Sequence, residues 1–256
     1  MAAKLLAARG VGKRFGGVKA LDDVSLTIHA GEIYGLIGPN GAGKTTFFNC
    51  LTGLYVPDAG GFDFCGTALA ANAPHRAAER GIARTFQNIR LFANMSAREN
   101  VMVGRHVRTQ AGVFGAILRT RATRQEEDAI CRRAEELLHY VGIADRADDL
   151  AKNLAYGDQR RLEIARALAT DPRLLCLDEP AAGMNATETE ELRLLIEGIR
   201  RDGTTVLLIE HDVKLVMGLC DRVAVLDYGR LLCEDEPAVV QKNPAVIEAY
   251  LGGSLA

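Results

Sequence analysis

The residues best suited to chemistry lie in one short run between an apolar stretch and a helix-like stretch. The run follows the strand-like residues 33–37 and has the spacing Gly-x-x-x-x-Gly-Lys-Thr. In this phosphate-loop pattern, glycines let successive backbone N–H groups face an anion. A helix that begins near Lys44 points its positive end at the same place. The run therefore predicts a nucleoside triphosphate site formed by Gly38, Pro39, Asn40, Gly41, Ala42, Gly43, Lys44, Thr45 and Thr46.

Two charged or hydroxylated side chains of this run have specific roles in that chemistry. Lys44 can reach the β- and γ-phosphates, and the Thr45 hydroxyl can bind Mg²⁺. A second apolar stretch, Leu174–Leu177, ends in Asp178 and Glu179. Because parallel sheets bind ligands at the carboxyl ends of their strands, Asp178 is predicted to hold Mg²⁺, through water. Glu179 is predicted to orient and deprotonate the attacking water.

Three further residues are candidates for the same site. His211 follows the apolar stretch Thr205–Ile209, where it could contact a γ-phosphate and hold the water in line. Gln87 follows the stretch Ile82–Phe86, and it could bind Mg²⁺ and report on the water. Phe15 could stack on the base of the nucleotide, because a π-face suits a purine, or it could pack in the core of a strand.

The elements that must position these residues alternate between strand and helix patterns. The first thirty residues alternate between apolar and polar and, with Gly61–Gly66, predict antiparallel strands. Further strands are expected at Ile33–Ile37, Ile82–Phe86, Leu174–Leu177, Thr205–Ile209 and Val223–Leu226, with helices at Thr45–Leu54, Gln159–Ala169, Glu188–Arg201 and Pro244–Leu251. This alternation favours an α/β fold with a mostly parallel sheet covered on both faces.

The stretch from Asn88 to Leu154 has a different pattern. Its helical periodicity runs through Ala97–Val107 and Arg124–Val141, with many Arg and Glu residues. We expect a helical insertion between two strands of the sheet. The part Gly112–Arg121 is compatible with a short helix or with a loop.

Length and composition narrow the class of protein. A chain of 256 residues can form one large domain or two small ones, and the net charge of −2 gives no sign of nucleic-acid affinity. The six cysteines show no metal-ligand spacing, and free thiols suit a reducing compartment. No apolar run is long enough to span a bilayer. If the protein acts at a membrane, other subunits must hold it there.

The segment Asn153–Leu168 resembles the signature motif of ABC (ATP-binding cassette) ATPases. The phosphate loop, Gln87, the Asp178-Glu179 pair and His211 occur in that family's order, so the resemblance covers essentially the whole chain. It implies one nucleotide-binding domain over residues 1–256, with two parts. Residues 1–87 and 157–256 form a P-loop NTPase (RecA-like) core together with an antiparallel β subdomain. Residues 88–156 form a helical insertion. The resemblance also implies that two ATPase subunits, identical or different, sandwich two ATP molecules. In that arrangement Ala155, Gly157 and Asp158 contact the ATP held by the other subunit.

Two positions depart from the usual family pattern. Ala155 stands where Ser is common, which removes a hydroxyl that could donate to the γ-phosphate. Asn185, in the loop 181–185 that resembles the family's D-loop, stands where Asp is usual and contributes no charge. Because neither change removes a Mg²⁺ ligand or the base, we expect ATPase activity to survive.

The signature segment of this chain, with Ala155 in place of Ser, looks like that of the ATPase subunits of branched-chain amino acid importers. The same likeness extends to residues 179–185, 209–217 and 243–252. That resemblance implies permease subunits, a periplasmic substrate-binding protein, and a peripheral position at the cytoplasmic face of the bacterial inner membrane. The insertion, with Gln87, should form a groove for a permease helix, and Leu91 and Phe92 are candidate contacts unless they are buried locally. Lipopolysaccharide-export ATPases look similar in several motifs and are the alternative. A soluble ABC ATPase acting on DNA or ribosomes is disfavoured, because the chain has one phosphate loop and only a short insertion.

Overall fold

The computed structural model describes residues 3–108 and 121–252, and the chain forms two compact units. The first unit comprises Met1–Arg84 with Arg173–Ala256, and the second comprises Thr85–Pro172. The second unit is longer than the insertion 88–156 expected from the sequence, because it includes the whole helix of the signature motif.

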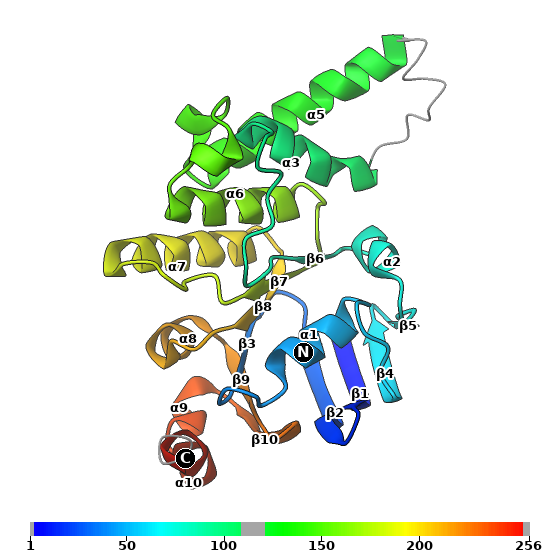
Figure 1. Cartoon of the computed structure of the whole chain (residues 1–256), viewed down its shortest axis with the longest axis vertical. Helices are drawn as coiled ribbons and strands as arrows, with labels where there is room; N and C mark the ends of the chain where they lie inside the picture. Colours follow the sequence, from blue (N-terminus) through cyan, green and yellow to red (C-terminus); the bar gives the residue numbers. More distant parts are fainter. Residues whose placement is uncertain (1–2, 109–120, 253–256) are drawn as a thin grey trace. The chain divides into compact units, whose positions relative to one another are not determined.

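A six-stranded sheet forms the centre of the first unit (Figure 1). Its strand order is β10-β9-β3-β8-β7-β6, and all neighbours are parallel except β10 with β9. Every residue of β3, β7 and β8 is buried, as the continuous apolar runs of a sheet covered on both faces require. The predicted α/β class is therefore confirmed. The strands are β3 (Ile33–Ile37), β6 (Ile82–Arg84), β7 (Leu174–Asp178), β8 (Thr205–Ile209), β9 (Arg222–Asp227) and β10 (Arg230–Asp235).

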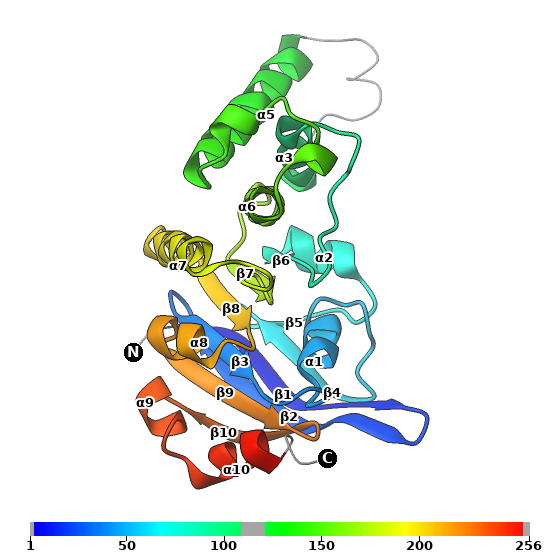
Figure 2. The ribbon, with the colours of Figure 1, turned by 60° about the vertical axis from the view of Figure 1, so that its left-hand side comes forward.

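A second, antiparallel sheet has the order β2-β1-β4-β5. Its strands are β1 (Lys4–Phe15), β2 (Val18–His29), β4 (Ala59–Phe64) and β5 (Thr67–Ala68). Figure 2 shows the long β1–β2 hairpin with β4 beside β1. The alternation in the first thirty residues predicted β1 and β2, and the Gly61–Gly66 stretch predicted β4, while β5 was not predicted. The hairpin turns at the expected Gly16-Gly17 pair.

The helices of the first unit are α1 (Lys44–Leu51), α2 (Pro74–Glu79), α7 (Ala186–Arg201), α8 (Val213–Leu219), α9 (Pro237–Val240) and α10 (Pro244–Gly252). Helix α1 ends before the expected Leu54, because Gly53 adopts a left-handed φ of 74° that stops the helix. Strand β6 ends at Arg84 rather than Phe86, because its partner register with β7 stops there. The short helices α8 and α9 were not predicted from the sequence.

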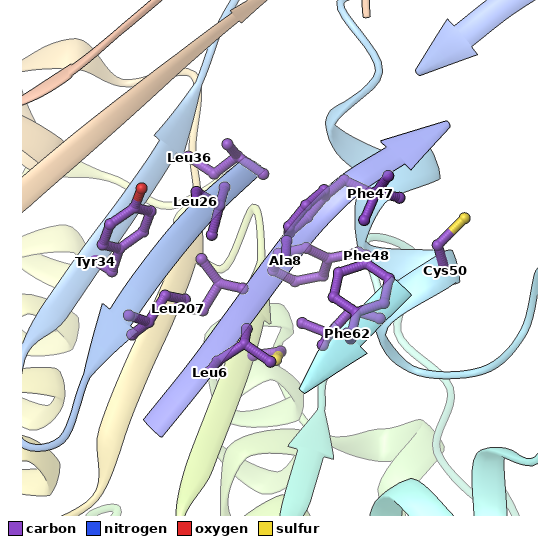
Figure 3. Close-up of a cluster of buried hydrophobic side chains, with 14 of the residues drawn as sticks. Leu6, Ala8, Leu26, Tyr34, Leu36, Phe47, Phe48, Cys50, Phe62 and Leu207 are labelled. Carbon is purple, nitrogen blue, oxygen red and sulfur yellow. The ribbon is translucent and has the colours of Figure 1, made fainter. Parts of the chain in front are cut away.

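Helix α1 joins the two sheets of the first unit into one core. Its aromatic residues Phe47 and Phe48 are fully buried, and the ring of Phe47 meets that of Phe62 edge-on at 5.3 Å. Figure 3 shows both rings in one cluster with Leu6 and Phe62 of the antiparallel sheet and Leu36 and Leu207 of the parallel sheet. This packing holds the start of α1, and thus the phosphate loop, against both sheets.

The second unit is helical. It contains α3 (Ala97–Arg105), η1 (His106–Arg108), α5 (Arg121–Tyr140), η2 (Ala144–Arg146), η3 (Ala151–Asn153) and α6 (Tyr156–Leu168), and α3 packs on both α5 and α6. A Cβ on Gly104 would lie 2.2 Å from the carbonyl oxygen of Arg166, so α3 approaches α6 as closely as only glycine allows. Most of the predicted segment Gly112–Arg121 lies outside the described residues.

Candidate functional site

The phosphate loop joins β3 to α1 in a backbone conformation that needs glycine at two of its positions. Gly38 has a φ of 149°, and a Cβ there would lie 2.0 Å from the carbonyl oxygen of Leu226. Gly43 has a φ of 104°, and a Cβ there would lie 2.4 Å from the carbonyl oxygen of Ala20. The loop is therefore pressed against β9 and β2, which presets its shape for an anion.

Lys44 is the first residue of α1, and its side chain is only 6% exposed. Its Nζ donates hydrogen bonds to the carbonyl oxygens of Gly38 (2.7 Å) and Pro39 (2.9 Å). Burial lowers the pKa of Lys44, and the nearby carboxylates of Glu179 and Asp178 oppose this effect. The lysine thus folds back along the phosphate loop, with its ammonium group close to both carboxylates. Thr45, the next residue, is exposed at the start of the helix.

The acidic pair of the site stands at the end of β7. Asp178 is 1% exposed, and its Oδ2 lies 2.9 Å from Nη2 of Arg84. The same guanidinium donates through Nη1 to Asn49 Oδ1 at 2.6 Å and to Thr52 Oγ1 at 3.2 Å. Because Asn49 belongs to α1, Arg84 ties the predicted Mg²⁺ partner to the helix that follows the phosphate loop.

The sequence-based reasoning missed Arg84, and one signal could have found it. Arg84 is the last residue of β6, and it pairs in register with Cys176 on β7, two positions before Asp178. A cation on the strand next to a buried carboxylate is a natural partner for that carboxylate, since burying a charge is costly unless it is paired.

Replacing Arg84 by Met should leave the buried Asp178 carboxylate without this cation. We expect the free energy of unfolding to fall by about 3 kcal/mol, measured by urea unfolding of the nucleotide-free protein. The matched control is Arg193→Met on α7, where the ion pairs with Glu190 and Glu197 are more exposed and a change below about 1 kcal/mol is expected. Equal effects of the two changes would mean that Asp178 does not depend on Arg84.

Glu179 and His211 contact each other at the end of the central strands. His211 Nε2 lies 2.7 Å from Glu179 Oε1, so the ring and the carboxylate share a hydrogen bond. Glu179 adopts a left-handed φ of 50°, and its N–H donates to the carbonyl oxygen of Ile209 at 2.9 Å. A left-handed conformation costs a non-glycine residue free energy, and such strain concentrates at functional sites. The structure thus brings together two residues predicted to act on the same water molecule.

Glu210 is a second residue that the sequence-based reasoning missed. Its side chain is 4% exposed, and it accepts hydrogen bonds from the N–H of Ala181 (2.8 Å) and of His211 (3.0 Å). Burial raises the pKa of Glu210, while the N–H donors oppose the shift. Glu210 therefore links the loop 181–185 to the backbone that carries His211.

Asn185 ends that loop and caps α7. Its Oδ1 accepts from the N–H groups of Thr187 (2.9 Å) and Glu188 (3.0 Å), while Glu188 accepts from the Asn185 N–H at 2.9 Å. This reciprocal arrangement is a capping box. Asn185 therefore caps α7 although it carries no charge.

Phe15 is at the end of β1 and is 45% exposed, which leaves ring surface for a base. Its ring meets that of Tyr55 edge-on at 5.3 Å, and Lys13 Nζ lies 5.5 Å from its centroid. Tyr55 thus supports the ring that we predict to stack on the nucleotide.

The remaining candidate residues lie in the second unit. Helix α6 begins at Tyr156, and Ala155, at the N-cap position, makes no side-chain cap. Gly157 and Asp158 are in the first turn, whose N–H groups can bind an anion. Gln87 is exposed. The structure therefore assembles Lys44, Asp178, Glu179 and His211 in the first unit and places Gln87, Ala155, Gly157 and Asp158 in the second.

A phosphate loop, a carboxylate pair and a helix that carries the signature define an ATP-binding cassette. Residues 21–182 match the ABC transporter family. The chain belongs to this family and is the ATP-binding ATPase of an ABC transporter complex. Residues 230–256 match a more particular family, described as "Branched-chain amino acid ATP-binding cassette transporter".

The similarity to individual proteins extends over nearly the whole chain. The high-affinity branched-chain amino acid transport ATP-binding protein LivG of Salmonella typhimurium is 48% identical over 98% of this chain and 99% of its own length. The lipopolysaccharide export system ATP-binding protein LptB of Escherichia coli is 34% identical over 96% of this chain and 97% of its own length. The alternative suggested by the sequence is thus the more distant relative.

Solved structures give the same picture. The ADP conformation of MJ1267, an ATP-binding cassette of an ABC transporter, matches with a TM-score of 0.84 and 29% identity over 97% of this chain and 99% of that one. MJ0796, as a dimer in a post-hydrolysis state with ADP and Pi, matches with a TM-score of 0.78 and 25% identity over 91% of this chain and 99% of that one.

Within residues 3–108 and 121–252, no helix is both long and apolar enough to cross a bilayer.

Proposed function

We propose that this chain is the ATP-hydrolysing subunit of an importer for branched-chain amino acids or related amino acids and amides. The observation that carries the proposal is the match of residues 230–256 to the branched-chain family, together with 48% identity to LivG over nearly the whole chain. An export role like that of LptB has less support, because the identity to that protein is 34%.

Mg²⁺ is the metal ion that the donor groups of the first unit would suit. Thr45 offers a hydroxyl and Asp178 a carboxylate, which are the hard oxygen donors that Mg²⁺ prefers. Among the described residues, no group of three or more His, Cys, Asp and Glu side chains could enclose a metal ion. This fits Mg²⁺, which usually takes one or two protein ligands and completes its shell with phosphate oxygens and water. When bound, the ion would neutralise charge on the phosphates.

The side chains of the site divide the work of hydrolysis. Lys44 would leave its two carbonyl partners and contact the β- and γ-phosphates. Glu179 would accept a proton from the attacking water. His211, which shares a hydrogen bond with Glu179 in this structure, would contact the γ-phosphate and hold the attacking water in line. Gln87 would sense the water and Mg²⁺.

We further propose that a second ABC ATPase subunit completes each ATP site. The first turn of α6, with Ala155, Gly157 and Asp158, would meet the ATP held by the partner, and the dimeric MJ0796 structure supports such pairing. ATP would close the dimer because only the closed state makes both sets of phosphate contacts, and hydrolysis would reopen it. The assembly would include permease subunits and a periplasmic substrate-binding protein, with this subunit at the cytoplasmic face of the inner membrane.

Uptake by the intact complex tests this assignment. The chain should be purified with its permeases, reconstituted in proteoliposomes and supplied with ATP, the cognate binding protein and labelled leucine, other amino acids and small amides. We expect ATP-dependent uptake of leucine or a related substrate, and none with Lys44→Ala. Purification with an export complex, and no amino acid uptake, would contradict the proposal.

A further inference from the structure

Helix α6 contains a buried pair of opposite charges that none of the roles above uses. Arg160 and Glu163 are 3% and 1% exposed, and Arg160 Nη1 lies 3.6 Å from Glu163 Oε2. The residues are three apart, so both face the same side of the helix. Removing two charges from water is costly, and an ion pair alone often does not offset that cost. The additional contacts of the two side chains are therefore informative.

Arg160 binds the backbone of the segment that contains Gln87. Its Nη1 donates to the carbonyl oxygen of Phe86 at 2.9 Å, and its Nη2 donates to the carbonyl oxygen of Gln87 at 2.6 Å. The same Nη2 donates to the hydroxyl of Tyr156 in the first turn of α6 at 2.9 Å. One planar guanidinium thus joins the Gln87 peptide to the start of the signature helix.

Glu163 binds the same segment from its N–H side. Its Oε1 accepts from the N–H of Phe86 at 3.3 Å and from the N–H of Arg90 at 3.4 Å. Burial raises the pKa of Glu163, while these N–H groups and the cations of Arg166 and Arg160 oppose the shift. Together, Arg160 and Glu163 make four hydrogen bonds to the backbone of residues 86–90.

This geometry matters because α6 and the Gln87 segment are expected to contact different nucleotides. Gln87 is predicted to sense Mg²⁺ and water at the site of its own subunit. The first turn of α6 is predicted to contact the ATP of the partner subunit. If the segment and the helix are held together, a change at one site displaces the contact at the other.

We propose that Arg160 and Glu163 are positioning residues that hold the Gln87 segment and the first turn of α6 as one rigid body, and so couple the two ATP sites of the dimer. The inference rests on the proposed function, which assigns Gln87 and α6 to these sites. It predicts that removing the pair lowers the ATPase rate of the complex and the stimulation of that rate by the transporter. The affinity of the phosphate loop for ATP should not change.

The main test is the double change Arg160→Met/Glu163→Met, made in the full chain within the transporter complex. It removes both charges together, so neither is left buried alone, and such apolar replacements of ion pairs are often tolerated. We expect the affinity of the purified subunit for a fluorescent ATP analogue to change less than about twofold, and kcat of the complex to fall about tenfold. The stimulation of ATPase activity by the substrate-loaded binding protein should be lost.

Hydrogen exchange reports directly on the positioning role. The amides of Phe86 and Arg90 should exchange faster in the double variant than in the wild type, because Glu163 no longer accepts from them. Arg160→Lys provides a conservative comparison, since it keeps a charge beside Glu163 but lacks the planar fork that reaches two carbonyls. We expect a normal melting temperature and an intermediate loss of turnover in Arg160→Lys.

The matched control is Arg105→Met. Arg105 lies in the same unit, and it also binds a backbone carbonyl and a carboxylate, those of Ala169 and Asp171 beyond the far end of α6. It should leave stimulation by the binding protein unchanged. Wild-type turnover, stimulation and exchange in a folded double variant would overturn the proposal, as would wild-type values in Arg160→Lys if the double variant fails to fold.

A separate experiment distinguishes this inference from the proposed function. The wild-type complex in proteoliposomes, with Arg160 and Glu163 intact, is assayed for ATP-dependent uptake of amino acids. If it takes up none, the proposed function fails. If it takes them up while the Arg160 and Glu163 changes have no effect on coupling, only the positioning role fails.

Discussion

Glu179→Gln is expected to bind ATP as tightly as the wild type and to hydrolyse it at least about 100-fold more slowly. Glutamine has the shape of glutamate and can still accept the hydrogen bond that His211 Nε2 makes to Oε1 at 2.7 Å. It cannot take a proton from water. The backbone at Glu179 is strained, with a φ of 50°, as is common at functional sites.

The measurements are steady-state phosphate release and the binding of a fluorescent ATP analogue. Size-exclusion chromatography with ATP and the partner ATPase subunit should also show a persistent dimer, since closure is no longer followed by hydrolysis. Glu190→Gln, on the exposed face of α7, is the control and should hydrolyse ATP at the normal rate. Turnover above a tenth of the wild-type rate in Glu179→Gln would remove Glu179 from the role of base.

Lys44→Ala should weaken nucleotide binding by at least about 100-fold. Charge-assisted hydrogen bonds contribute about 1.5–3 kcal/mol each, and contacts to two phosphates would be lost together. In this structure the ammonium group already lies at the loop, bonded to the carbonyl oxygens of Gly38 and Pro39. Phosphate oxygens of the nucleotide would accept the hydrogen bonds that Lys44 Nζ now donates to these carbonyl oxygens, so the lysine needs little movement to bind the nucleotide.

Titration calorimetry with ATP and with ADP measures this loss. The loss should be larger for ATP than for ADP, because only ATP has the γ-phosphate. Lys242→Ala, at an exposed position after α9, is the control. Thermal unfolding of both variants is needed, because Lys44 also bonds to the loop itself. Unchanged ATP affinity in a folded Lys44→Ala protein would contradict the assignment of the loop.

Much of the fold followed from local patterns. The five residues of β3 and of β8 are apolar enough to be buried on both faces, and both strands have the predicted bounds. The start of α7 was predicted two residues late, because the capping box of Asn185 and Glu188 extends it to Ala186. The antiparallel pairing of β10 with β9 and the helix α8 were missed, since short segments depend on the sheet and helices around them.

The sequence by itself determined the class of protein and the phosphate chemistry. The phosphate loop, the Asp178-Glu179 pair and the signature segment are each a continuous run of residues. Neighbours in the chain are therefore enough to specify the local shape of each run. Tertiary structure alone decided which groups meet across the fold: Arg84 with Asp178, His211 with Glu179, and Arg160 with the Gln87 segment. These contacts depend on strand order and on how α6 packs, and both arise from long-range burial rather than from any local pattern.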